Sequence, residues 1–179
     1  MEHLAASMDI ALMNIEDIAR HYVASPGYDM SSSVVKSFRQ FIIDLAQVEL
    51  PGIDFQYVDF EPYFRGPELS LEDIHADVHQ GKMLVTRLFN NSDLLGPEIN
   101  LIFRCIHEMH HIKLNVDFGW KGECTTAFHL MSFTNNLLFK QIIFSETIGQ
   151  VAVRLHQGEF PTHQKVVLFE PDVLSQFRI

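Results

Sequence analysis

The sequence predicts a single all-α domain, a bundle of six to seven helices with an ordered loop at about residues 51–67. Three observations lead to this fold class. The length of 179 residues suits one domain with a full core, so residues 1–179 are taken as one helical metal-binding domain. The hydrophobic content of 47% predicts a globular chain. Apolar residues recur at helical spacing along most of the chain, and little of it shows a convincing strand pattern.

Capping residues and helix breakers set the expected helix limits. Ser25-Pro26-Gly27 ends the first helix, and Ser70 begins the third, with acidic residues in its first turn. The third helix either breaks at Gly81 or continues to Phe89. Pro97 opens the fourth helix, where its missing N–H costs nothing. The expected helices cover residues 4–24, 31–48, 70 to 81 or 89, 97–115, 123–133 and 137–156.

Two segments fall outside this helical pattern. Residues 51–67 are rich in aromatic residues and are interrupted by Pro and Gly, which predicts an ordered covering loop or a short strand at Phe55–Phe60. The tail at Val166–Phe169 is expected to form a short strand or an extended arm.

Composition excludes several function classes. Thirteen Lys and Arg against 23 Asp and Glu give a net charge of -10, which argues against a nucleic-acid partner and against simple electrostatic docking on anionic lipid. No signal peptide and no transmembrane span are expected. Cys105 and Cys124 are read as free thiols in a reducing compartment, so a cytoplasmic location is expected.

The strongest chemical signal is the run His107-Glu108-Met109-His110-His111, which matches H-E-x-x-H. Residues four apart share one face of a helix, so His107 and His111 can hold one cation between them. On a helical wheel both lie at the edge of the apolar stripe, whereas His110 falls near its centre. This position is where a core meets a pocket, which suits a reactive site.

A third metal ligand is expected at Glu123, eleven residues after His111. Gly119 and Gly122 in the connection allow the chain to reverse and return the start of the next helix to the metal. Two imidazoles and one carboxylate are a donor set for catalytic zinc and, equally, for non-haem iron. The expected cofactor is therefore one divalent transition-metal ion, zinc or iron. Glu108 either completes the ligand set or acts as a catalytic general base.

This spacing resembles that of the coenzyme Q biosynthesis protein 4 family, helical proteins of ubiquinone biosynthesis. The family carries H-D-x-x-H, eleven residues and then Glu, with Gly directly before that Glu. This chain has His107 to His111, eleven residues ending at Gly122, and then Glu123. The firm match covers residues 107–123 and a looser one residues 97–158; Glu108 stands where the family has Asp. The resemblance implies a mostly α-helical fold, a bound divalent metal, a prenylated or quinone-type ligand with lipid association, and modification of the quinone ring.

Several functional alternatives stay open. One is a zinc-dependent hydrolase or peptidase with Glu108 as general base. Another is a di-iron carboxylate protein, because Glu72 to His75 forms a second E-x-x-H motif; Glu16, Glu123 and Glu146 would be its extra carboxylates. A third is a metal-binding protein without catalysis. Partners left open are a small apolar or prenylated ligand, peripheral membrane contact and a homo-oligomer.

Overall fold

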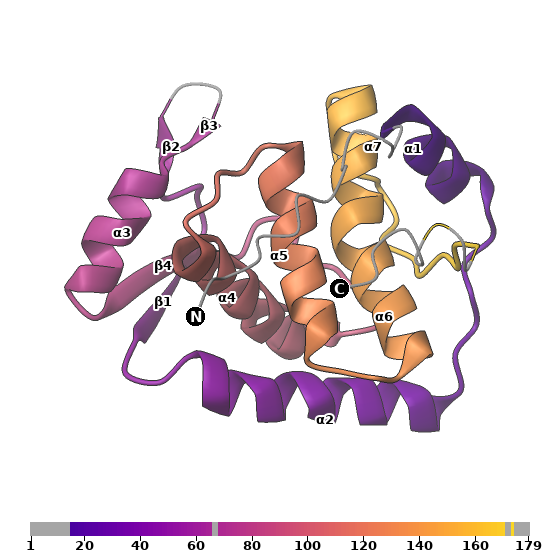
Figure 1. The fold of residues 1–179 in the computed structure, drawn as a ribbon, viewed down its shortest axis with the longest axis horizontal. Coiled ribbons are helices and arrows are strands. Elements are labelled where there is room, and N and C mark those ends of the chain that lie inside the picture. Colours follow the sequence, from indigo (N-terminus) through magenta and orange to yellow (C-terminus); the bar gives the residue numbers. More distant parts are fainter. Residues whose placement is uncertain (1–14, 66–67, 171–172, 174–179) are drawn as a thin grey trace, which may run out of the picture.

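The computed structural model describes residues 15–65, 68–170 and 173, and over this range the chain is mostly helical, as the sequence predicts (Figure 1). Residues 4–14 of the first predicted helix lie outside the described part. The helices are α1 (Ile15–Ala24), α2 (Ser32–Glu49), α3 (Leu71–His79), α4 (Gly96–Leu114), α5 (Trp120–Ser132), α6 (Leu137–Phe144) and α7 (Gln150–Gln157). The strands are β1 (Asp54–Val58), β2 (Phe64–Arg65), β3 (Glu68–Leu69) and β4 (Lys82–Thr86).

Helices α4 and α5 lie side by side in the middle of the fold, with α2 running along one side of them and α6 on the other (Figure 1). Helix α1 packs against α7 at one end. The larger hydrophobic core fills the space between these helices and includes Phe38 of α2, Ile106 of α4 and Phe144 of α6, each fully buried. No helix in the described part of the chain is long and apolar enough to cross a lipid bilayer.

The purely α-helical class is wrong in one respect, because the segment predicted as a loop at 51–67 contains strands. β1 pairs in parallel with β4, with Phe55 opposite Met83, and β2 pairs antiparallel with β3. The alternative prediction of a short strand at Phe55–Phe60 is close to β1. Helix α3 connects the two parallel strands, so this end of the molecule is a small β-α-β unit.

The segment after Gly81 is a strand rather than a continuation of the helix. Gly81 has φ +76°, a left-handed conformation that ends α3. Met83 and Val85 are buried and the other three residues of β4 are half-buried, which is the two-residue period of a strand. Met83 and Val85 pack with Ile74, Cys105 and other residues in a second hydrophobic cluster against α4.

The last helical run is continuous from residue 137 to 157, because a π-helical turn at Ser145–Gly149 joins α6 to α7. It ends at Gly158, whose φ is +87°. The predicted tail at Val166–Phe169 is an extended arm and not a strand. Its Val167 N–H donates to Ser145 Oγ at 2.8 Å, so side chains of the π-helical turn hold the arm in place.

Candidate metal centre

Helix α4 carries the two histidines, and its C-terminal end is closed next to the second of them. The helix ends at Leu114, and Asn115 takes a left-handed conformation with φ +51°. Asparagine tolerates this conformation better than most residues do. The Val116 N–H then donates to the His111 carbonyl at 3.1 Å, so the chain turns back directly after the ligand pair.

The connection to α5 depends on a close approach between Asp117 and Gly122. A Cβ atom built on Gly122 would lie 1.8 Å from the Asp117 carbonyl oxygen. Only glycine, which has no Cβ, fits there. The Asp117 carboxylate accepts from the Gly119 N–H at 3.0 Å and fixes the same turn. These contacts place Glu123 in the first turn of α5, facing α4.

His107, His111 and Glu123 come together as the sequence predicts. His107 Nε2 lies 3.0 Å from Glu123 Oε2 and 3.2 Å from His111 Nε2, and His111 Nε2 lies 3.7 Å from the same carboxylate oxygen. Ligands held at about 2.1 Å from a tetrahedral ion are about 3.4 Å apart. The three measured distances bracket that separation, so the donor set fits a single transition-metal ion.

The Val116 carbonyl fixes which nitrogen of His111 carries the proton whenever that ring is neutral. Its Nδ1 lies 3.2 Å from the Val116 carbonyl oxygen, which can only accept, so Nδ1 carries the proton and donates. The Nε2 lone pair of the neutral ring then faces His107 and Glu123. Phe118 stacks on the His111 ring with centroids 4.3 Å apart, which further limits its rotation. A second hydrogen bond of this kind is typical of metal-ligating histidines.

Charge attraction holds the three groups together. Burial favours the neutral ring of His107, but the Glu123 carboxylate outweighs burial and raises the pKa of His107. Burial would likewise raise the pKa of Glu123, but the charges and hydrogen bonds of His107 and His111 lower it to about 2. Glu123 is therefore a carboxylate at neutral pH, which is the form that binds metal.

Glu108 lies half-buried next to this group, and desolvation of its carboxyl raises its pKa. The charges of His107 and His111 oppose that shift, whereas the charge of Glu123 adds to it. Glu108 Oε2 and His107 Nδ1 have no hydrogen-bond partner among the described residues. Arg104, one turn earlier, donates to the carbonyls of Thr86, Leu88 and Phe89. An acidic group whose buried oxygen is unpaired would be suited to exchange a proton with a ligand of a metal bound here.

Other residues named from the sequence do not join the centre. Glu146, on the π-helical turn, accepts from Ser92 and Gln150, and its burial raises its pKa to about 7. Cys124 is buried but belongs to no ligand group formed by the described residues. The second E-x-x-H motif, Glu72 to His75, also lies outside the two ligand groups within residues 15–65, 68–170 and 173. The geometry therefore lends the di-iron alternative no support.

The second of those groups was not predicted. It contains Glu49, His110 and His129, from three different helices. His110 was placed at the centre of the apolar stripe of α4, and it is indeed fully buried. A histidine in the middle of an apolar stripe was the signal, because a buried imidazole needs polar partners. The partners lie 61 residues before it and 19 residues after it in the numbering, so spacing alone could not identify them.

Comparison with known protein families, with characterised proteins and with solved structures gives no match for this chain. The site is therefore interpreted from its own geometry, and the likeness to the coenzyme Q biosynthesis protein 4 family remains a hypothesis.

Proposed function

We propose that the protein binds one divalent transition-metal ion through His107, His111 and Glu123 and uses it to act on a small apolar, quinone-type ligand. The main support for this metal site is the convergence of three donor atoms, whose pairwise distances are 3.0, 3.2 and 3.7 Å. Two imidazoles and one carboxylate leave at least one coordination position for a ligand or a water molecule. The donor set accepts zinc and iron alike.

The surroundings of the site favour a small ligand over an extended peptide. The side chains of His107, His111 and Glu123 are 17%, 0% and 7% exposed, so access is narrow and lies on the His107 side. A peptidase needs an open cleft in which a substrate strand can pair with an exposed edge. The quinone-type substrate class comes from the resemblance of residues 107–123 to the ubiquinone-biosynthesis family.

Glu108 supplies the proton chemistry in this proposal. A bound metal polarises an oxygen of its ligand and makes that oxygen more acidic. Glu108 directly follows His107 and interacts with the charges of His107 and His111. Its raised pKa brings it closer to neutral pH, where a general acid or base is most effective. The residue thereby takes or returns a proton at the ligand oxygen.

The metal site is tested first by Glu123→Gln. Replacing the anionic ligand with a neutral amide of the same shape is expected to weaken Zn²⁺ binding by about 100-fold or more. Isothermal titration calorimetry on the metal-free protein measures this change. Glu98→Gln is the matched control, because Glu98 is an exposed first-turn carboxylate on α4, and its affinity should equal that of the wild type. Equal affinities in all three proteins would reject Glu123 as a ligand.

Protein loaded with Co²⁺ separates the proposed function from the hydrolase alternative. A ubiquinone analogue with a short isoprenoid tail is expected to shift the visible absorption of the bound Co²⁺, in the wild type and in Glu108→Gln alike. Hydrolysis of a peptide and ester panel by the wild type, abolished in Glu108→Gln, would instead establish the hydrolase. An unchanged spectrum at saturating quinone would remove the quinone-type ligand from the proposal and leave the metal site standing.

A further inference from the structure

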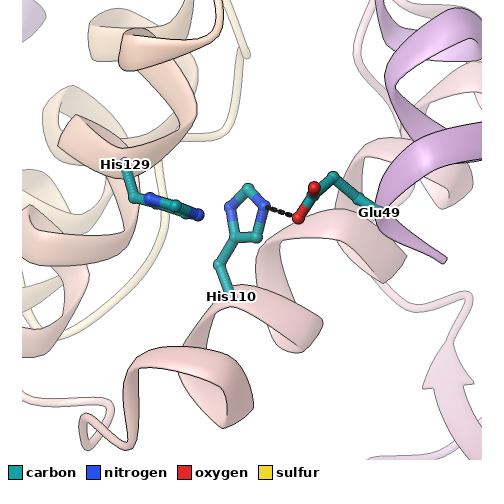
Figure 2. Close-up of side chains that lie close together, drawn as sticks. All are labelled: Glu49, His110 and His129. Carbon is teal, nitrogen blue, oxygen red and sulfur yellow. Dashed lines mark hydrogen bonds and ion pairs between the residues drawn. The ribbon is translucent and has the colours of Figure 1, made fainter.

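A second set of metal-binding side chains lies on another face of α4. Glu49 is the last residue of α2, His110 is on α4 and His129 is near the end of α5. One donor atom from each lies within 4.8 Å of the others. Figure 2 shows the His110 ring between the other two side chains, with one nitrogen toward Glu49 and the other toward His129. None of these residues belongs to the site of the proposed function.

Glu49 fixes the tautomer of His110. Its Oε2 accepts from the Lys113 ammonium at 2.7 Å and lies 3.1 Å from His110 Nε2. An ionised carboxylate can only accept, so Nε2 carries the proton of the His110 ring. Lys113 also donates to the Glu49 main-chain carbonyl at 2.9 Å, which holds the carboxylate in place. The lone pair of the neutral His110 ring is therefore on Nδ1.

That lone pair is buried and faces an imidazole. His110 is 0% exposed, and its Nδ1 has no hydrogen-bond partner among the described residues. Leaving a buried polar atom unpaired costs free energy, so a native structure rarely keeps one without a reason. The ring that Nδ1 faces is His129, whose centroid is 4.6 Å from that of His110 at an interplanar angle of 78°.

We propose that His110 and His129 bind a second divalent transition-metal ion, with Glu49 orienting the His110 ring. A carboxylate that accepts from the far nitrogen of a metal-binding imidazole is a recurrent arrangement, because it fixes the tautomer and raises the basicity of the ligand. Imidazole nitrogen suits zinc, copper and nickel. Phe133 packs against both rings and limits their movement. Its ring centroid is 5.8 Å from that of His110 and 5.1 Å from that of His129. His129 is half-buried, so water can fill the remaining coordination positions.

This second ion binds more weakly than the first, because only two protein side chains hold it. Zn²⁺ titrated calorimetrically into metal-free, full-length protein is expected to show two binding events in the wild type. His129→Ala should weaken the second event by about 100-fold or more and leave the first unchanged. His129 is the residue to replace, since His110 is fully buried and its removal can unfold the protein. Glu49→Gln should keep both events and weaken the second by about tenfold.

The matched control is His79→Ala, because His79 lies in the last turn of α3 as His129 does in α5. It also breaks up the pair of half-buried His75 and exposed His79, which are four residues apart and offer another place for Zn²⁺. A second event lost in His79→Ala, or retained at full affinity in His129→Ala, would overturn the proposal. This test is independent of the proposed function. A variant lacking His107 and His111 should lose only the first binding event, so failure of the first site and failure of the second site can be told apart.

Discussion

Protein in which both His107 and His111 are replaced by alanine is expected to retain no transition-metal ion after gel filtration, whereas the wild type retains close to one equivalent. The weaker ion proposed at His110 and His129 dissociates from both proteins during filtration. The substitutions remove two of three donors, and the remaining carboxylate cannot hold a transition metal by itself. Glu123 also loses the hydrogen bond at 3.0 Å and the two neighbouring rings that keep its pKa at about 2. Elemental analysis of the purified proteins gives the measurement.

The control for this double variant is His75→Ala with His79→Ala. These residues are also histidines four positions apart on a helix, α3, but no carboxylate from another element completes a ligand group around them in the described part of the chain. The control should keep its equivalent of metal. Circular dichroism must show that both double variants are folded, because His111 is fully buried. Full metal occupancy in folded protein lacking His107 and His111 would refute the ligand assignment.

The second large effect is expected at Gly122, which touches no metal. Gly122→Ala places a Cβ 1.8 Å from the Asp117 carbonyl oxygen, so the turn must open. The contact is with main chain, which cannot swing aside as a flexible side chain would. Glu123 is the next residue, so its carboxylate leaves the position facing His107. We expect loss of tight metal binding together with a fall of about 3 kcal/mol in the free energy of unfolding.

Gly27→Ala is the matched control for Gly122→Ala. A Cβ at Gly27 would meet only the Lys165 side chain at 3.4 Å, an ordinary contact distance. Metal binding should be unchanged there, and the free energy of unfolding should change by about 0.5 kcal/mol or less. Chemical denaturation and calorimetry on the two variants separate a general effect of losing glycine from the specific effect at the turn. A stable, metal-binding Gly122→Ala protein would show that another conformation of residues 115–119 can position Glu123.

The convergence of the three candidate ligands could be predicted from the sequence because two of them are local. His107 and His111 are related by a single helical turn, and a helix fixes that geometry whatever surrounds it. Glu123 is reached across a short connection in which glycine spacing already indicates a reversal. The prediction therefore needed no knowledge of long-range packing, and the structure brings the three residues together as expected.

The strands and the second group could not be predicted in the same way. β1 and β4 pair across a connection that contains α3, and each strand has only five residues, too few for a two-residue period to stand out from a helical one. Glu49, His110 and His129 meet through the packing of α2 and α5 against α4. Contacts of this kind depend on how helices cross, which a single sequence does not reveal.

If the proposed metal binds, the reciprocal pair of hydrogen bonds between His111 and Val116 would link its exchange to the end of α4. The Val116 N–H closes the helix on the His111 carbonyl, and the Val116 carbonyl aims the His111 ring. Helix termini open locally at a small fraction of the free energy of global unfolding. When this last turn frays, the ring loses its anchor, so an ion held by His111 would dissociate and reload while the rest of the fold stays intact. Bound metal should in turn slow hydrogen exchange at the Val116 amide, which makes that amide a reporter of occupancy.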